Sequence, residues 1–328
     1  METTEFMPHQ SSPELQNLNQ TIGKIKNEIQ KVIVGQDRMI DLIMAGLLTG
    51  GHVLLEGVPG IAKTLTAKLV AKTLSVDFSR IQFTPDLMPT DVVGTSVFNM
   101  KTSEFTFNKG PIFSNIVLID EINRAPAKTQ AALFEVMEES QVTVDGQTYQ
   151  MGIPFMVMAT QNPVEQEGTY KLPEAQLDRF LFRIKMQYPS FEEEKLILEK
   201  FKEDFSGALN RTVDKVCSVE EILGCRKVIE QIYIKAELID YIAKIVHNTR
   251  NNGDLFLGAS PRASLAILKS AKAMAGMSAR NFVTPDDIKH VANPVLNHRI
   301  ILSPEREMEG TQPEDVINEI IKNIDVPR

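Results

Sequence analysis

The N-terminal part of the chain carries apolar residues at the spacing of an amphipathic helix. From Leu15 to Val32 they recur at alternating steps of three and four residues, which places them on one helical face. A second helix pattern runs from Met39 to Leu47 and ends before the glycine pair at 50–51. Residues 1–13 are polar and aperiodic, so we expect them to form a disordered lead.

Between His52 and about Met186 the pattern changes to short apolar runs separated by helix patterns. The runs lie at 53–55, around Ile81 and Phe83, and at 116–119, 155–158 and 180–182. Runs that are apolar at every position indicate strands covered on both faces, which is typical of a parallel sheet. Helix patterns at 64–74 and 129–138 complete βαβ units, so we expect an α/β domain.

Two segments interrupt this rhythm, and each predicts a β-hairpin. Residues 95–108 carry apolar positions on either side of a polar break at Lys101-Thr102. Residues 141–150 alternate on either side of Asp145-Gly146, and Asp-Gly in that setting is the strongest short hairpin signal. A parallel α/β domain that carries two hairpins is an unusual combination.

After Tyr188-Pro189 the chain has a helical pattern with marked helix starts. These starts are Ser190 before three glutamates, Ser218 with Glu221, Ser260-Pro261 and Thr284-Pro285. No strand-like alternation follows. We therefore expect an α/β core over residues 14–188 and an all-α domain over residues 189–328.

Composition and charge narrow the classes of function. The chain has 328 residues, of which 43% are hydrophobic and 24% charged, as expected for a globular protein of about two domains. Its 35 basic and 43 acidic residues give a formal net charge of −8. Affinity for nucleic acid depends largely on neutralising phosphates. No nucleic-acid partner is therefore expected.

Cysteine content and the N-terminal residues predict a cytoplasmic protein. Cys217 and Cys225 are the only cysteines, which argues against a disulfide scaffold or a cysteine-rich zinc site, and we interpret them as packing thiols. The first residues lack the basic and apolar regions of a secretory signal. No apolar run approaches the ~18 residues of a membrane span.

A glycine-rich segment follows the first predicted strand and opens the next helix. It matches the phosphate-binding pattern Gly-x-x-x-x-Gly-Lys-Ser/Thr except that alanine replaces the second glycine. Its residues are Gly57, Val58, Pro59, Gly60, Ile61, Ala62, Lys63 and Thr64, with Leu65 next in the helix. Backbone N–H groups of such a loop and the positive helix end hold phosphates.

Three residues of this segment have specific expectations. Lys63 adds a positive charge beside the phosphates, and the Thr64 hydroxyl is a ligand for Mg²⁺. We expect a negative φ at Ala62, which an alanine in the first helical turn adopts without strain. The alternative is a Gly/Pro turn beside a surface lysine, which the strand before and the helix after disfavour.

A buried strand pattern at 116–119 ends in two carboxylates, Asp120 and Glu121. Asp120 is a candidate for holding Mg²⁺ through water. Glu121 is then the candidate general base that activates a water molecule. Read alone, the pair also fits a solvated turn between a strand and a helix. Adjacent carboxylates at the end of an apolar strand are costly without a cation, and the upstream loop favours the functional interpretation.

Three further motifs follow in order, and together they carry a family resemblance. They are Ala159-Thr-Gln-Asn-Pro163, Leu177-Asp-Arg-Phe180 and Gly258-Ala-Ser-Pro-Arg262. The chain resembles AAA+ ATPases, and residues 109–113 and 172–181 resemble the MoxR family, in which alanine is common at the second glycine. The likeness extends over nearly the whole chain from about Leu15.

The resemblance implies an AAA+ core with a parallel five-stranded sheet, followed by an all-α lid. The two hairpins look like the helix-2 insert and the pre-sensor-1 insert of the clade that includes magnesium chelatase subunits and MCM helicases. By the same resemblance, Asn162 matches sensor 1, which orients the attacking water. As an alternative, asparagine before proline is a common turn former.

The resemblance assigns the remaining site residues. Arg179 matches an arginine finger that reaches the nucleotide of a neighbouring subunit; the alternative is a salt bridge to Asp178 or Glu174. Arg262 matches sensor 2 inside a lid helix. The segment that packs against adenine corresponds to Val34, Gly35 and Gln36. The sequence does not decide what Arg299 contacts.

The implied activity is Mg²⁺-dependent ATP hydrolysis at the subunit interfaces of a homo-oligomeric ring, expected to be a hexamer. Such a ring remodels or matures protein complexes, and a von Willebrand factor A domain protein is one candidate partner. A DNA-directed motor is an alternative, disfavoured by the charge of −8. A slow nucleotide-dependent switch is another, disfavoured by the presence of Glu121, Asn162 and Arg179.

Overall fold

A computed structural model of the chain describes residues 12–58, 60–101, 103–163, 169–170, 172–202 and 213–327. Most of the predicted lead at 1–13 lies outside the described residues. The elements, in chain order, are α1 (Pro13–Gln30), α2 (Asp37–Thr49), β1 (His52–Glu56), α3 (Lys63–Leu74), β2 (Phe78–Gln82), α4 (Pro89–Val93), β3 (Gly94–Asn99), β4 (Glu104–Lys109), η1 (Pro111–Phe113), β5 (Ile116–Asp120), η2 (Ile122–Arg124), α5 (Ala127–Glu139), β6 (Gln141–Val144), β7 (Gln147–Gln150), β8 (Met156–Gln161), α6 (Glu174–Leu177), β9 (Phe180–Lys185), α7 (Phe191–Phe201), α9 (Val219–Gln231), α10 (Ala236–Arg250), β10 (Leu255–Leu257), α11 (Pro261–Met277), α12 (Pro285–Leu296), β11 (Ile301–Leu302), α13 (Pro304–Met308) and α14 (Pro313–Lys322).

Internal contacts divide the chain into two compact units. The sheet unit spans Ile25–Val219, and the helical unit consists of the residues before Ile25 together with Glu220–Arg328. This grouping assigns α7 to the sheet unit, where Lys200 Nζ donates to the carbonyl of Gln30 at 2.8 Å. The boundary at residue 188 that composition indicates stays a prediction.

The sheet unit is built on five parallel strands, as the apolar runs predict. Their order is β2-β5-β8-β1-β9, and each neighbouring pair is parallel. The carboxyl ends of parallel strands meet at one edge of the sheet, where ligands of open α/β sheets bind. β1, β5 and β8 end at Glu56, Asp120 and Gln161, so the predicted site segments all leave the sheet at that edge.

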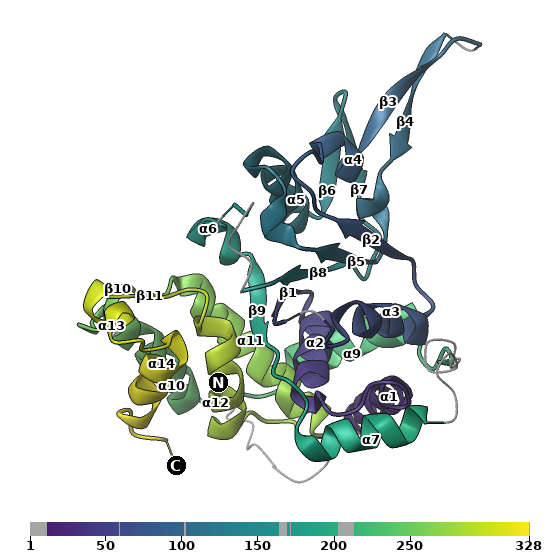
Figure 1. Cartoon of the computed structure of the whole chain (residues 1–328). Coiled ribbons are helices and arrows are strands. Elements are labelled where there is room, and N and C mark those ends of the chain that lie inside the picture. The colour runs from purple at the N-terminus through teal and green to yellow at the C-terminus, as the bar shows by residue number, and fades with distance from the viewer. Residues whose placement is uncertain are drawn as a thin grey trace, which may run out of the picture. The chain divides into compact units, whose positions relative to one another are not determined.

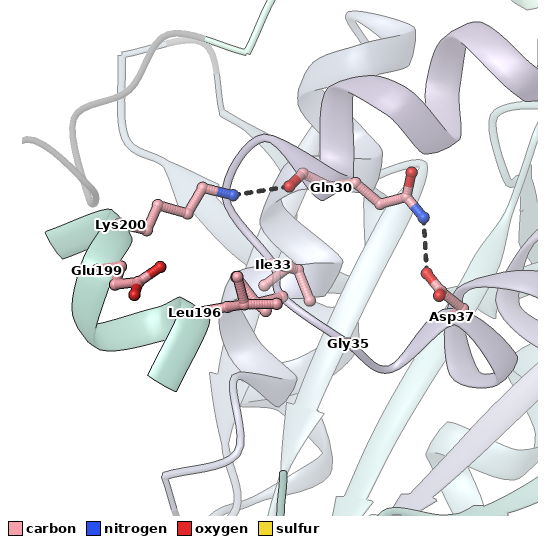
Figure 2. A pocket seen from close by; sticks show the side chains of 8 residues that line it. Gln30, Ile33, Gly35, Asp37, Leu196, Glu199 and Lys200 are labelled. Atoms are coloured by element: carbon pink, nitrogen blue, oxygen red, sulfur yellow. Dashed lines mark hydrogen bonds between the residues drawn. The ribbon is translucent and has the colours of Figure 1, made fainter. Parts of the chain in front are cut away.

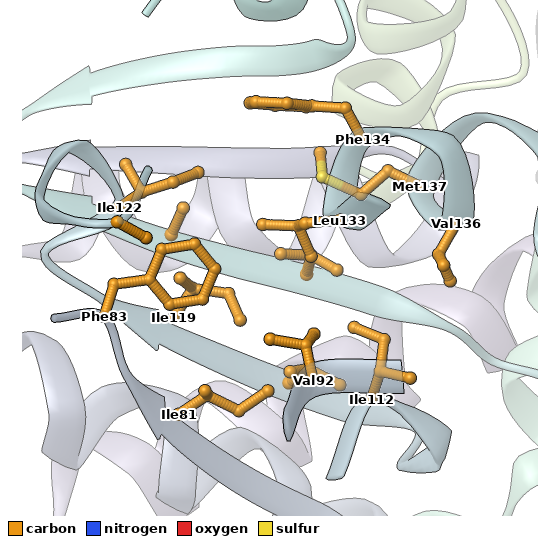
Figure 3. Close-up of a cluster of buried hydrophobic side chains, with 14 of the residues drawn as sticks. Ile81, Phe83, Val92, Ile112, Ile119, Ile122, Leu133, Phe134, Val136 and Met137 are labelled. Carbon is orange, nitrogen blue, oxygen red and sulfur yellow. The ribbon is translucent and has the colours of Figure 1, made fainter. Parts of the chain in front are cut away.

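Helices cover both faces of this sheet. On one side α2 contacts β1 and β9, and α3 contacts β5. On the other side Ile119 of β5 joins Leu133 and Phe134 of α5 in a fully buried cluster, which Figure 3 shows from close by. Burial of each such side chain contributes ~1.5–3 kcal/mol. This layer therefore fixes the strand that carries Asp120.

Both predicted hairpins are present. β3 pairs with β4 and β6 with β7, each antiparallel, and in Figure 1 the β3–β4 hairpin extends well beyond the sheet. The two hairpins pack against each other, since the rings of Phe107 and Tyr149 lie 4.6 Å apart and the Ser96 hydroxyl donates to Asp145.

The helical unit confirms the expected all-α lid and adds one short antiparallel pair, β10–β11. Ser260 and Thr284 are N-cap residues before prolines, as predicted, and the Asp287 side chain completes a capping box with Thr284. Cys217 and Cys225 are both buried, which agrees with packing thiols. Across the described ranges, none of the helices has the length and apolar character needed to span a membrane.

Candidate active site

The glycine-rich loop requires glycine at two positions for different reasons. A Cβ on Gly57 would lie 3.1 Å from Met186 Cβ and 2.5 Å from Ile61 Cδ1, so a larger residue there would force Met186 and Ile61 to shift. Gly60 has a φ of +88°, a left-handed backbone that favours glycine. Ile61 is 8% exposed and anchors the loop on the core.

The prediction of a negative φ at Ala62 is wrong. Its φ is 61° and its ψ 19°, a left-handed conformation immediately before α3. The residue therefore precedes the helix instead of lying in its first turn, and this conformation costs a non-glycine residue roughly 1–2 kcal/mol. The Ala62 carbonyl accepts from Thr66 N at 2.9 Å and from Thr66 Oγ1 at 3.0 Å, which fixes the first turn of α3.

Lys63 lies over the loop that precedes it. Its Nζ donates to the carbonyl of Gly57 at 2.6 Å, so the lysine side chain crosses the loop from the start of α3 to the residue after β1. Val58 is half-buried, and Pro59 lies outside the described residues.

A cavity of about 380 Å³ lies where the loop meets the strand ends, and we call it the loop cavity. The loop and α3 contribute Gly60, Ala62, Lys63, Thr64 and Leu65 to its lining. The ends of β5 and β8 contribute Asp120, Glu121 and Asn162. The fold thus brings predicted residues from three separate segments to one space.

Both carboxylate oxygens of Asp120 have partners. Arg80 Nε on β2 lies 2.6 Å from Oδ2, and Thr160 Oγ1 on β8 donates to Oδ1 at 3.1 Å. Asp120 is only 7% exposed, and such a carboxylate is unfavourable without opposite charge or donors. Neighbouring strands on both sides therefore stabilise it.

Glu121 follows Asp120 with a left-handed backbone, at a φ of 57°. Its backbone N–H donates to Thr160 Oγ1 at 3.0 Å, so one hydroxyl group connects both acidic residues. Its Oε2 accepts from Gln82 Nε2 at 2.9 Å and lies 2.9 Å from Arg124 Nε. The side chain is 35% exposed and reaches the loop cavity.

Asn162 lies just after the last residue of β8 and is 9% exposed. It lines the loop cavity together with Lys63 and Glu121. An amide at this position is able to donate to and accept from a small polar molecule in the cavity.

Arg179 precedes β9 and is not among the residues that line the loop cavity of its own chain. Its Nε and Nη2 lie 2.7 and 2.6 Å from Glu138 Oε2 on α5, and its guanidinium carbon lies 5.9 Å from the centre of the Phe134 ring. A salt bridge, the alternative interpretation of Arg179, is therefore present, with Glu138 as its partner.

The predicted adenine segment lines a second cavity, of about 540 Å³, which Figure 2 shows. Val34 and Gly35, in the segment between α1 and α2, line it, and Ile33 and Leu196 add apolar surface. We call this space the base cavity.

The base cavity is joined to the glycine-rich loop through the end of β9. Gly35 and Gln36 both have left-handed backbones, with φ of 69° and 60°. Gln36 Nε2 donates to the carbonyl of Gln187 at 3.1 Å. Gln187 follows Met186, against which Gly57 packs.

Two arginines of interest belong to the helical unit. Arg262 is exposed in the first turn of α11. Arg299 is 8% exposed, and its Nη1 donates to the carbonyl of Val295 near the end of α12. The contact of Arg262 with nucleotide stays a prediction.

Comparisons with known proteins give the family. Residues 52–182 match the ATPase family associated with various cellular activities (AAA), and residues 247–320 match the AAA lid domain. The chain is 43% identical over 317 residues to chaperone MoxR1 of Mycobacterium tuberculosis, covering 94% of this chain and 83% of that protein. This chain belongs to the MoxR family of AAA+ ATPases.

Other relatives of this MoxR-family ATPase match over almost their full length. YeaC of Bacillus subtilis is 47% identical over 312 residues, covering 95% of this chain and 97% of YeaC. A crystal structure of a "putative ATPase" from Cytophaga hutchinsonii superposes with a TM-score of 0.88 at 44% identity, covering 96% of this chain and 97% of that one.

The oxygen donors at the loop cavity of this MoxR-family ATPase fit Mg²⁺. Thr64 and Asp120 both line it, and Mg²⁺ is usually held by one or two carboxylates together with substrate phosphates. Within the part of the chain that the structure describes, no cluster of three or more His, Cys, Asp or Glu side chains is placed to hold a metal ion.

Sequence reasoning missed the residues that hold the acidic pair in this MoxR-family ATPase. Arg80 and Gln82 bind Asp120 and Glu121 from β2, and Thr160 bridges both from β8. One signal was available. Arg80 and Gln82 are two residues apart in a strand pattern and so share a face.

Proposed function

We propose that this MoxR-family ATPase hydrolyses Mg²⁺-bound ATP in the loop cavity and uses the cycle to remodel or mature a protein complex. The observation that carries the proposal is the meeting of Lys63 with the adjacent carboxylates Asp120 and Glu121 on one cavity, from two separate chain segments. A phosphate-binding loop facing a metal carboxylate and a candidate base is the arrangement that phosphoryl transfer to water requires.

The glycine-rich loop binds the β- and γ-phosphates in this proposal. Its backbone N–H groups and the positive end of α3 attract the phosphate oxygens. Lys63, which is bound to the Gly57 carbonyl at 2.6 Å, turns its ammonium group to them. Loss of Lys63 therefore removes the positive side chain that the loop itself brings to the phosphates.

Glu121 is the proposed general base. Its carboxylate takes a proton from a water molecule as the water oxygen bonds to the γ-phosphorus and the bond to the β–γ bridging oxygen breaks, which releases ADP. Asn162 orients that water through its amide. Thr64 and Asp120 would hold Mg²⁺, which neutralises charge on the phosphate oxygens when bound.

The base cavity accepts the adenine ring. Ile33, Val34 and Leu196 offer it apolar surface. The connection from the Gln36 side chain through Gln187 to the Met186–Gly57 contact supports one nucleotide extending over both cavities.

We further propose a ring, expected to be a hexamer, in which Arg179 acts on the nucleotide of the neighbouring copy. Arg179 lies outside the lining of its own loop cavity and is 27% exposed beside Glu138. Such arginines contribute ~10³–10⁵ in rate. Arg262 is proposed to contact the phosphates from the lid, because an arginine at a helix start is disfavoured by the helix dipole unless an anion is near.

The proposed partner is a protein. One relative is named a chaperone, and the formal charge of −8 disfavours nucleic acid. A von Willebrand factor A domain protein is a candidate client on the family resemblance alone.

Paired substitutions test the hydrolytic site. Lys63→Ala should abolish binding of a fluorescent ATP derivative, whereas Glu121→Gln should keep binding and lower kcat by ~10²–10⁴-fold. Lys72→Ala and Glu135→Gln remove the same charges from exposed positions of α3 and α5 and serve as controls. Equal ATPase rates in wild type and Glu121→Gln would contradict the assignment of the base.

Mixing experiments test the ring. Arg179→Ala protein and Lys63→Ala protein should each be inactive and should regain part of the activity when mixed, because the mixture contains interfaces with an intact loop and an intact arginine. Absence of any regained activity would count against action on a neighbouring copy.

A further inference from the structure

Asp120, the proposed Mg²⁺ carboxylate, is bound to a cation from its own chain. Arg80 Nε lies 2.6 Å from Oδ2, while Thr160 Oγ1 donates to Oδ1 at 3.1 Å. The Asp120 side chain is 10% exposed, so a full negative charge there is unfavourable without a counter-charge. Arg80 supplies that counter-charge.

The ion pair follows from the register of the sheet edge. β2 is an edge strand beside β5, and Gln82 is directly opposite Asp120, two residues beyond Arg80. Residues two apart share a face of the strand. Gln82 binds Glu121 and Arg80 binds Asp120, so one strand holds both members of the proposed hydrolytic pair.

We propose that Arg80 is a positioning residue that holds Asp120 while the site lacks Mg²⁺ and gives it up when Mg²⁺-nucleotide binds. This inference rests on the proposed function. A guanidinium group at Oδ2 competes with a divalent cation for the same oxygen, and the two repel each other at short distance. Thr160 occupies the other oxygen, which leaves the position of Arg80 as the one to be exchanged.

The side chain of Arg80 is suited to such an exchange. It is 54% exposed, in contrast to Asp120, so it regains hydration when it leaves. It also lines the loop cavity beside Lys63 and Thr64, where phosphate oxygens offer a guanidinium group an alternative anionic partner. Asp120 is thereby never left without a counter-charge.

The proposal predicts how nucleotide affinity depends on Mg²⁺. Nucleotide alone leaves the ion pair intact, whereas Mg²⁺-nucleotide must open it. The Arg80–Asp120 pair therefore lowers the gain in affinity that Mg²⁺ gives. Removing the guanidinium group should raise that gain by about tenfold, equivalent to ~1.4 kcal/mol.

The test measures the dissociation constant of a fluorescent, non-hydrolysable ATP analogue in excess EDTA and in saturating Mg²⁺. The gain from Mg²⁺ is the dissociation constant in EDTA divided by that in Mg²⁺. This ratio should rise in the order wild type, Arg80→Lys, Arg80→Gln, because lysine makes a weaker ion pair with Asp120 than arginine does. Lys72→Gln removes one positive charge from an exposed position of α3 and should leave the ratio unchanged.

The outcomes separate this proposal from the proposed function. An unchanged or smaller ratio in Arg80→Gln, with wild type binding nucleotide, overturns the exchange and leaves the proposed function standing. Equal weakening with and without Mg²⁺ shows that Arg80 contributes to nucleotide binding independently of Mg²⁺, which also overturns the exchange. If wild type binds nucleotide under neither condition, the proposed function fails and this inference fails with it.

Discussion

Acidification should destabilise the sheet unit through His52, the first residue of β1. The imidazole is 6% exposed, and its ring lies 5.5 Å from that of Phe155 in an edge-on arrangement. Val157 N donates to Nδ1 at 2.9 Å, so Nδ1 carries no proton. Nε2 lies 3.0 Å from the carbonyl of Met137 and therefore carries the proton. The folded chain holds a neutral histidine.

Burial lowers the pKa of His52 from 6.5 to about 4, and the hydrogen bond to Met137 offsets only part of this effect. Above about pH 6.5 the residue is neutral in both the folded and the unfolded chain. Between pH 6.5 and 4 the unfolded chain binds a proton that the folded chain does not. The free energy of unfolding therefore falls by up to ~1.4 kcal/mol per pH unit, or about 3 kcal/mol in total.

The comparison variant is His52→Gln, whose amide stays neutral throughout this range. Other groups titrate in the same range, so the informative quantity is the difference in free energy of unfolding between wild type and His52→Gln. From pH 7 to pH 4, wild type should lose about 3 kcal/mol of unfolding free energy relative to His52→Gln, as measured by urea denaturation.

NMR of wild type provides a second readout that does not depend on the variant being stable. The His52 ring resonance should not titrate until about pH 4. A His52 resonance that titrates near pH 6.5, or a free-energy difference that is constant with pH, would refute the reasoning.

Two further predictions concern the loop cavity. Ala62→Gly should relieve the left-handed strain and raise stability by about 1 kcal/mol, seen as a Tm higher by ~2–4 °C; a lower Tm would contradict the strain assigned to Ala62. Thr160→Val removes the hydroxyl that joins Asp120 and Glu121 and should lower the free energy of unfolding by ~1.5–3 kcal/mol, measured by thermal denaturation. Thr160→Ser retains the hydroxyl and should retain most of that stability. Equal losses in the two variants would show that the methyl group, not the hydroxyl, matters.

Much of the fold was predictable because burial leaves a local trace in the sequence. The run at 116–119 is apolar at each position, and every residue of β5 is buried. Asp145-Gly146 marks the turn of the β6–β7 hairpin, and Ser190 caps α7 with Glu193 as its pattern indicates. These features depend on residues close together in the chain, so sequence alone is enough to predict them.

The partners of the acidic residues were not predictable, because they depend on which strands become neighbours. Arg80 meets Asp120 only because β2 is beside β5 in a register that pairs Gln82 with Asp120. The sign of φ at Ala62 has a similar origin. It is set by how the loop closes from β1 onto α3, and side-chain type alone does not reveal it.

Backbone strain gives an argument for the site that does not depend on family motifs. N-cap residues normally have an extended backbone, as Ser190 and Thr284 do. Gln36, Ala62 and Glu121 are N-cap residues with left-handed backbones instead, and none makes a side-chain capping bond. All three belong to the predicted nucleotide site. Strain of this kind persists where the surrounding structure imposes it and is concentrated at ligand-binding positions. Because helix stability does not account for these conformations, they support the proposal that the backbone before three helices is directed towards one ligand.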